Sequence, residues 1–217
     1  MLYIIRHGKT DWNNLHKIQG RTDIPLNEEG RKMAAEAAEE YKDVHFDVCY
    51  CSPLIRARET AEILLAGRDV PIIFDERLVE MGFGIYEGIE NSFSIPDCPI
   101  NAMFWTPELY TTPVEGGESM DELFARTGEF LRELALPQVK EGKDVLIVGH
   151  GATNSCIVCQ VKNRERKDFW AEGIPNCKLQ TLIDTSQDRI DTVESLFGAL
   201  PQATTLEEAQ EERFHDE

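Results

Sequence analysis

Short runs of apolar residues recur along the chain, and their branched side chains predict the strands of a sheet. Near-continuous apolar runs are typical of strands that are covered on both faces. Four such runs lie at residues 2–5, 46–51, 71–74 and 145–148. A more alternating pair follows at residues 178–183 and 189–193. We therefore expect the sheet to be built from segments spread over most of the chain.

Between these runs, apolar residues recur at helical spacing and predict amphipathic helices. One set comprises Met33, Ala34, Ala37, Ala38 and Tyr41, and the other comprises Met120, Leu123, Phe124, Phe130, Leu131 and Leu134. Two helix starts are also marked in the sequence. Ser52 and Pro53 indicate a cap followed by a first-turn proline, and Ser119 with Glu122 indicates a capping box.

Strands and helices thus alternate, which predicts an α/β protein, a three-layer α/β/α sandwich with a mostly parallel central sheet. We expect one domain over residues 1–203, because no linker interrupts the alternation. Prolines break up residues 78–118, a partly irregular insert that is either a lid over a site or a surface insertion. Residues 204–217 hold six acids and one arginine, and we expect a solvated helix or a frayed end there.

The charge balance narrows the function further. The 217 residues include 22 Lys and Arg against 40 Asp and Glu, a formal net charge of −18. A nucleic-acid or membrane-surface partner requires a basic face, which this composition excludes. Six cysteines are too sparse for a secreted disulfide scaffold, and the apolar run at the N-terminus is too short for a signal peptide. We expect a cytoplasmic protein, and nothing in the sequence indicates a homo-oligomer.

Candidate chemistry follows three of the predicted strands directly. The run at 2–5 is followed by Arg6 and His7, the run at 46–51 is followed after a short turn by Arg56, and the run at 145–148 leads to His150. In an open parallel sheet the ligand crevice lies at the carboxyl ends of the strands. Two guanidiniums and two imidazoles therefore converge at one edge of a strongly acidic protein. Each motif alone is common, but together they indicate an anion site, most simply for phosphate.

The order of the motifs resembles that of the histidine phosphatase superfamily, the phosphoglycerate mutase-like proteins. The opening motif Arg-His-Gly-x-Thr-x-x-Asn is matched by Arg6, His7, Gly8, Thr10 and Asn13. Further matches are Ser52, Pro53, Leu54, Arg56, Ala57, Thr60 and Ala61, then Glu80 with Gly84, Glu87 and Gly88, then residues 116–119, and finally Gly149, His150 and Gly151. The resemblance covers residues 2 to about 183 and implies a phosphoglycerate mutase-like fold.

The resemblance also implies roles for individual residues. His7 is the expected nucleophile, Glu80 the expected proton donor, and Arg6, Arg56 and His150 the expected ligands of the phosphoryl oxygens. Phosphate or substrate contacts are further implied for Asn13, Gln19, Gly20 and Gly151.

The chemistry of these residue types agrees with those roles. Phosphoryl transfer requires mainly positioning and neutralisation of charge. The attacking nitrogen of His7 must be unprotonated, so its other nitrogen should donate to a backbone carbonyl near Gly8. Beside a dianion the charged form of His150 is favoured. We expect Glu87 to hold a loop.

No metal or cofactor is expected. The five histidines form no closely spaced pair. Cys49 with Cys51, on one face of a strand, and Cys156 with Cys159, one helical turn apart, are interpreted as small hydrophobic residues.

The family contains both mutases and phosphatases, and a mutase must hold a second anionic group. Residues 78–125 contain no Lys, Arg or His but include the aromatic residues Phe83, Tyr86, Phe93, Phe104, Trp105 and Tyr110, whereas mutases of the family carry basic residues in that insert. We therefore expect a neutral outer pocket and a preference for monophosphates. The favoured function is a metal-independent phosphomonoesterase that acts through a phosphohistidine on a small phosphorylated metabolite.

Three alternatives stay open with different weights. The first is mutase-type phosphoryl transfer, and the second is a non-catalytic phosphate-binding scaffold. A nucleotide-binding doubly wound domain is improbable, because the chain lacks both the dinucleotide fingerprint and the Walker lysine motif. The sequence does not identify the phosphomonoester.

Overall fold

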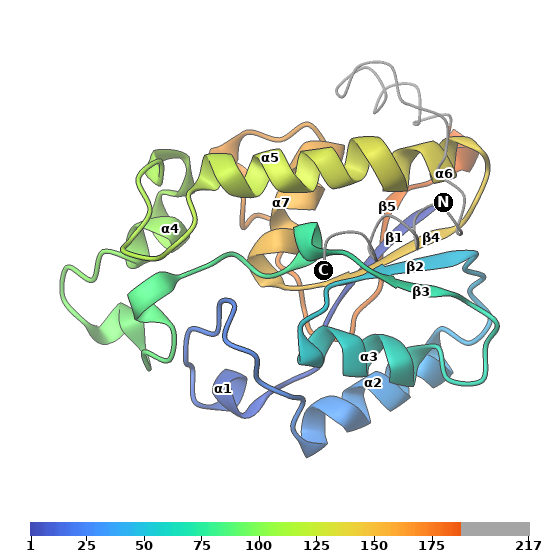
Figure 1. The fold of residues 1–217 in the computed structure, drawn as a ribbon, viewed down its shortest axis with the longest axis horizontal. Coiled ribbons are helices and arrows are strands. Elements are labelled where there is room, and N and C mark those ends of the chain that lie inside the picture. The colour runs from blue at the N-terminus through green and yellow to red at the C-terminus, as the bar shows by residue number, and fades with distance from the viewer. Residues whose placement is uncertain (188–217) are drawn as a thin grey trace, which may run out of the picture.

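A computed structural model describes residues 1–187, and its centre is a five-stranded sheet in the order β3-β2-β4-β1-β5 (Figure 1). Strands β1 to β4 are parallel, and β5 runs antiparallel to β1. The strands are β1 Leu2–Arg6, β2 Val48–Cys51, β3 Ile72–Phe74, β4 Val145–Gly149 and β5 Gln180–Ile183. The predicted mostly parallel sheet is confirmed. The strand expected at 189–193 and the acidic tail at 204–217 lie outside the described residues.

Helices cover both faces of the sheet, as Figure 1 shows with α2 and α3 on one side and α5, α6 and α7 on the other. Their bounds are α2 Glu28–Glu40, α3 Ile55–Leu64, α5 Met120–Phe130, α6 Leu136–Lys140 and α7 Gly151–Val161. Alternate strand residues face the two layers. Tyr50 and Ile147 share a core with Phe130, whereas Cys49 and Leu146 belong to the core that contains the alanines of α2 and α3. The three-layer α/β/α fold is therefore confirmed.

The two helix starts marked in the sequence have different outcomes. The capping box at Ser119 is confirmed, because its hydroxyl accepts from the backbone N–H of Glu122 at 3.2 Å. The cap at Ser52 is wrong. Helix α3 begins only at Ile55, whose N–H donates to the carboxylate of Asp23 at 2.8 Å. The cap of the first helical N–H thus comes from a distant loop, while the Ser52 hydroxyl accepts from the N–H of Leu54 at 3.3 Å, just before the helix.

The long helix predicted from Met120 onward changes its hydrogen-bonding pattern near its middle. A π-helical stretch, Leu131–Ala135, joins α5 to α6, and Pro137 follows it. Proline lacks a backbone N–H, and its ring clashes with the carbonyl four residues earlier. Such single wide turns are the usual form in which π-helical bonding occurs inside an α-helix.

The proline-rich insert forms short helical turns and has a core of its own. The turns are η1 Glu76–Leu78, η2 Gly84–Tyr86, η3 Ser92–Ser94, α4 Asn101–Trp105 and η4 Pro107–Leu109. Buried Met81, Ile100 and Met103 pack here with Met120 of α5 and Cys156 of α7. We call this cluster the third core. The short turns are interrupted by prolines, and the role of this insert as a lid stays a prediction.

The remaining short elements are α1 Asp11–Asn14, η6 Arg166–Asp168 and η7 Thr185–Gln187. All six cysteines are buried and none forms a disulfide, in line with their interpretation as small hydrophobic residues. Within residues 1–187, no helix combines the length and the apolar character needed to cross a membrane.

Candidate active site

A cavity of about 770 Å³ opens at the carboxyl ends of the parallel strands. The side chains that the sequence singled out meet there. Those that line the cavity are Arg6, His7, Asn13, Gln19, Gly20, Arg56, Glu80 and Gly151. His150 does not line it but lies fully buried behind His7, with the two ring centres 5.1 Å apart. Three strand ends and the segment after η1 thus supply one site.

His7 is fixed with one nitrogen committed to the backbone. Its Nδ1 donates to the carbonyl of Gly8 at 2.6 Å, which leaves Nε2 as the unprotonated nitrogen. Burial, together with the nearby guanidiniums of Arg56 and Arg6, holds the pKa of His7 well below its ordinary value. The ring is therefore neutral at neutral pH. This is the state that the sequence analysis required of a nucleophile.

The turn after β1 packs closely against the start of α2. A Cβ at Gly8 would lie 2.5 Å from the carbonyl oxygen of Gly30 in α2, so only glycine fits there. The N–H of Gly8 also donates to the hydroxyl of Thr60 at 3.0 Å. Helices α2 and α3 therefore both fix the position of the residue after His7.

The two arginines are positioned by backbone carbonyls. Arg56, fully buried, donates to the carbonyls of Thr22 at 2.9 Å and Gly20 at 2.7 Å. Arg6 donates to the carbonyl of Ile174 at 3.1 Å. Burial lowers the pKa of Arg56 to about 10 and lowers that of Arg6, so both remain charged at neutral pH. The Nε of each is buried without a partner within residues 1–187.

Glu80 lies at the N-terminus of α7. Its Oε1 accepts from the backbone N–H of Met81 at 2.8 Å and from that of Thr153 at 3.0 Å, while Oε2 accepts from the N–H of Ala152 at 3.1 Å. A Cβ at Gly151 would lie 3.5 Å from the Arg6 guanidinium carbon and 3.6 Å from Glu80 Oε2. The carboxylate and the guanidinium therefore border the same part of the cavity floor.

His150 is held by the hydroxyl of Ser52, a residue that the sequence analysis predicted as a helix cap. Its Nε2 lies 2.7 Å from the Oγ of Ser52, and its Nδ1 has no partner among the described residues. Burial, followed by the charges of Arg56 and nearby groups, holds its pKa well below the ordinary value. The ring is thus neutral in the ligand-free protein, and its charging beside a bound dianion stays a prediction. The sequence signal for Ser52 was its place at the end of β2.

Asn13 and Gln19 both line the cavity, and their side-chain oxygens are held by Thr10. The Asn13 Oδ1 accepts from the backbone N–H of Thr10 at 3.0 Å, and the Thr10 hydroxyl lies 3.0 Å from the Oε1 of Gln19. Both side-chain oxygens are therefore occupied, and neither NH₂ group forms a hydrogen bond within residues 1–187. These amides offer hydrogen-bond donors to an anion.

Glu87 stands apart from this site, as expected. Its carboxylate accepts from the backbone N–H groups of Arg21 at 3.0 Å, Thr22 at 2.8 Å and Phe83 at 3.1 Å. The expectation that Glu87 holds a loop is confirmed.

The outer cavity differs from the sequence expectation. Phe83, Phe93 and Phe104 of the insert do line it, and Trp170, which the sequence analysis missed, completes this aromatic wall. Two basic side chains, His16 and Lys17, line it as well. The prediction of a neutral outer pocket is therefore wrong. It was drawn from residues 78–125 alone, whereas the basic residues His16 and Lys17 come from a segment that lies far from them in the sequence.

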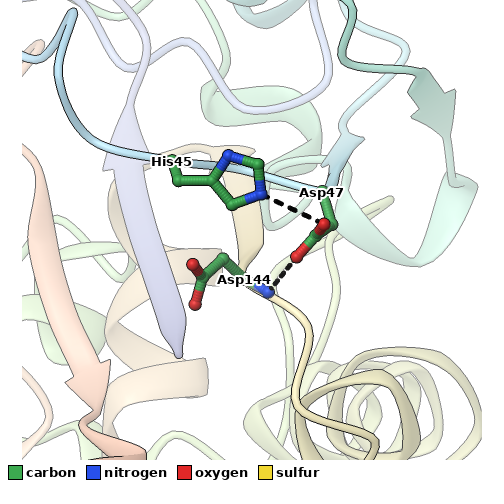
Figure 2. A group of neighbouring side chains, drawn as sticks. All are labelled: His45, Asp47 and Asp144. Atoms are coloured by element: carbon green, nitrogen blue, oxygen red, sulfur yellow. Dashed lines mark hydrogen bonds and ion pairs between the residues drawn. The ribbon is translucent and has the colours of Figure 1, made fainter.

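Within residues 1–187, one group of side chains could hold a metal ion, His45 with Asp47 and Asp144 (Figure 2). Its carboxylates already have partners: Asp47 accepts from the N–H of Asp144 at 2.7 Å, and Asp144 binds the N-terminal ammonium at 2.9 Å. The group precedes β2 and β4, whereas the cavity lies at their far ends. The length of β4 separates them by roughly 15 Å, so the group cannot contact a phosphate at His7.

Known proteins share this architecture and sequence pattern. A family model for the histidine phosphatase superfamily (branch 1) matches residues 2–195. The chain is 34% identical over 206 residues to a protein named probable phosphoglycerate mutase GpmB from Escherichia coli O1:K1, with 91% of this chain and 87% of that protein covered. It is 27% identical over 181 residues to phosphoserine phosphatase 1 of Hydrogenobacter thermophilus, with 83% and 85% covered.

A solved structure supports the same relationship. The mycobacterial glucosyl-3-phosphoglycerate phosphatase, determined with VO3, matches with a TM-score of 0.70 and 30% identity, covering 82% of this chain and 90% of that one.

Proposed function

The chain belongs to the histidine phosphatase superfamily, and on that basis we propose that it hydrolyses phosphomonoesters of small metabolites through a phosphohistidine at His7. The observation that carries the proposal is the hydrogen bond from His7 Nδ1 to the Gly8 carbonyl at 2.6 Å. It leaves a neutral Nε2, in a cavity that Arg6 and Arg56 make electropositive. A nucleophile and its charge-neutralising groups are thus preorganised.

The first half of the reaction transfers the phosphoryl group to the protein. The Nε2 lone pair of His7 attacks phosphorus, and the ester P–O bond breaks. The departing oxygen takes a proton from the carboxyl group of Glu80. Arg6 and Arg56 donate to the equatorial oxygens, where negative charge is spread in the transition state, and the buried His150 lies beside them next to His7.

The second half returns the phosphoryl group to water. Glu80, now a carboxylate, accepts a proton from the attacking water. The new P–O bond forms as the P–N bond breaks, and the electron pair returns to Nε2 of His7. Inorganic phosphate leaves, and both side chains regain their initial states.

Mutase-type transfer is the second candidate, favoured by the relationship to the protein named probable phosphoglycerate mutase GpmB. A mutase must hold two phosphates of one intermediate. Among residues 1–187, the basic side chains that line the cavity beyond Arg6 and Arg56 are His7, His16 and Lys17. That set supplies little counter-charge for a second phosphate dianion, and we therefore favour hydrolysis.

Rapid quenching with phosphate-labelled substrate tests the proposal. We expect an acid-labile, base-stable adduct on the wild type and on His45→Ala, which lies away from the cavity, but not on His7→Ala. Equal labelling of His7→Ala would contradict the nucleophile assignment. Isomerisation of phosphoglycerates should be measured in parallel, and a rate well above hydrolysis would establish the mutase alternative instead.

A further inference from the structure

One stretch that matches the family pattern, residues 116–119, takes no part in the steps proposed above. It packs closely against the segment that carries Glu80. The N–H of Glu118 donates to the carbonyl of Gly82 at 2.8 Å, and the N–H of Gly82 donates to the Oε2 of Glu118 at 3.4 Å. A Cβ at Gly117 would lie 3.2 Å from the same Gly82 carbonyl oxygen, so the two backbones are in direct contact. Glu118 is therefore fixed against Gly82, two residues after Glu80.

The carboxylate of Glu118 is almost completely buried and has two arginine partners. The Nε of Arg126 donates to its Oε1 at 2.7 Å, and the Nη2 of Arg126 donates to its Oε2 at 2.9 Å. The Nη2 of Arg21 lies 3.1 Å from the same Oε1. A fork-shaped pair of this kind fixes the geometry of both partners as well as holding them together. None of these three residues lines the cavity, so any effect on the reaction has to pass through other side chains.

The two arginines in turn bind the backbone of the segment that carries Glu80. The Nη1 of Arg126 donates to the carbonyl of Arg77 at 2.6 Å, and the Nε of Arg21 donates to the carbonyl of Glu80 itself at 3.3 Å. With the direct contact at Gly82, the segment is held before, at and after Glu80. The shared carboxylate joins the two arginines and so keeps these contacts in place.

We propose that Glu118 is a positioning residue for the proton donor Glu80. Through its two arginines it fixes the backbone of Glu80, and thereby the place of the carboxyl group that protonates the leaving oxygen. This inference rests on the proposed hydrolysis at His7. Three backbone N–H groups hold the Glu80 carboxylate at the start of α7, and they meet it only while its backbone stays where the cluster puts it. A displacement of about 1 Å in a reacting group can cost a hundredfold in rate.

The leaving group separates this effect from a general one. Glu118→Gln keeps the shape of the side chain and removes its charge, and we expect kcat/KM for an alkyl phosphate to fall by about tenfold. The value for nitrophenyl phosphate, which needs no proton donor, and the affinity for vanadate should stay unchanged. In a Glu80→Gln background the same exchange should have no further effect, because the proton donor is already lost. The control is Glu133→Gln, which removes a carboxylate from the nearby pair with Arg77 and should leave every value unchanged.

Arg21 gives a second variant that does not disturb a buried charge. Its side chain is half-exposed, so Arg21→Met should fold even where Glu118→Gln leaves its buried arginine partner without a counter-charge and unfolds the protein. We expect the same selective loss with alkyl phosphates, smaller than in Glu118→Gln because Arg126 keeps its contacts. Arg21→Lys retains a positive charge beside Glu118 and should restore part of the loss.

Amide hydrogen exchange gives a comparison without turnover. Glu118→Gln should accelerate exchange by about tenfold at the N–H of Met81, which donates to Glu80, and leave it unchanged at Gly8, whose N–H donates to Thr60.

Several results would overturn the proposal. Equal losses with both substrates, a parallel fall in vanadate affinity, or additive effects in the Glu80→Gln background would make Glu118 a general structural residue. Faster exchange at Met81 without hydrolysis by the wild type would retain the hold of Glu118 on this segment and reject the proposed function. Hydrolysis by the wild type, with turnover and exchange unchanged in Glu118→Gln, would do the reverse.

Discussion

The rings of His7 and His150 lie 5.1 Å apart between centres, yet each is held through a different nitrogen by a different kind of partner. Nδ1 of His7 donates to a backbone carbonyl, whereas Nε2 of His150 meets the hydroxyl of Ser52. Both rings are almost completely buried beside two guanidiniums. The two rings are thus suited to different tasks. His7 keeps an unprotonated Nε2 without a hydrogen-bond partner among residues 1–187, whereas the Nε2 of His150 is hydrogen-bonded to Ser52.

This pair makes the stability of the protein depend on pH. The pKa of both rings is lowered by folding, so between the folded and unfolded values the unfolded chain binds more protons. The free energy of unfolding is highest above the pKa of histidine in the unfolded chain. Below that pKa it falls by about 1.4 kcal/mol per pH unit for each ring. Urea unfolding measured from pH 8 to pH 5 should show this loss of unfolding free energy. The slope of unfolding free energy against pH should be shallower in His7→Asn and in His150→Asn. Equal slopes in all three proteins would refute it.

Ser52 is expected to position His150. Ser52→Ala leaves the buried Nε2 without its hydroxyl, and we expect a fall of about tenfold in kcat/KM and a similar loss of vanadate affinity. The control is Ser155→Ala, which removes a different buried hydroxyl, one that lies on α7. A merely structural serine would lower the melting temperature in both variants without a specific loss of vanadate binding.

Glu80 and Glu87 should respond differently to the leaving group. Glu80→Gln removes the proton donor, so turnover of alkyl phosphates should fall by about a hundredfold, whereas nitrophenyl phosphate, whose leaving group needs no proton, should be spared. Glu87→Gln weakens the contacts to the N–H groups of Arg21 and Thr22 and should affect both substrates in parallel. If Glu80→Gln slows both substrates equally, its role is structural.

Two glycines should separate fold from binding. Gly8→Ala places a methyl 2.5 Å from the Gly30 carbonyl oxygen, and we expect a loss of about 1–3 kcal/mol in unfolding free energy. Gly151→Ala meets its nearest atoms at ordinary contact distances and should fold with unchanged stability. Its methyl would contact both the Arg6 guanidinium at 3.5 Å and Glu80 Oε2 at 3.6 Å, so vanadate should bind more weakly. Thermal melts and vanadate titrations test both variants. A stable Gly8→Ala, or an unstable Gly151→Ala with unchanged vanadate affinity, would contradict these assignments.

Metal removal should leave catalysis intact. The proposed steps use only side chains and water, so a chelator should not change kcat. Asp144→Asn removes the carboxylate charge from the group in Figure 2 and breaks a half-exposed pair with the N-terminus, at a cost of at most about 1 kcal/mol. Activity that disappears in chelator and returns with a divalent cation would reject the scheme.

Much of the site could be predicted because parallel strands end at one edge. Once the apolar runs were recognised, Arg6, His7 and His150 had to lie close together, and the chemistry of a nucleophilic imidazole indicated its bond to the Gly8 carbonyl. The alternation of Cys49 and Tyr50 between two cores followed from the period of a strand.

The rest depends on contacts between segments that carry no shared local pattern. Asp23 caps α3 from a separate loop, and Lys17 reaches the cavity because its segment pairs with Glu90. Trp170 lies in a segment without marked periodicity, and its indole N–H donates to the Met103 carbonyl at 3.1 Å. Such pairings are decided by packing between segments, which the order of residues within either one does not encode.

The third core bears on how the substrate range of this protein can change over evolutionary time. An insertion or deletion in the wall would displace Ile100 and Met103 from the cluster shared with α5 and α7, so loop length is a poor route to new specificity. Phe93 is 57% exposed, lies outside that cluster and contacts the rings of Phe104 and Trp105. Single exchanges at such a side chain reshape the cavity while leaving the framework intact. Diversification should therefore proceed by point substitution along the wall.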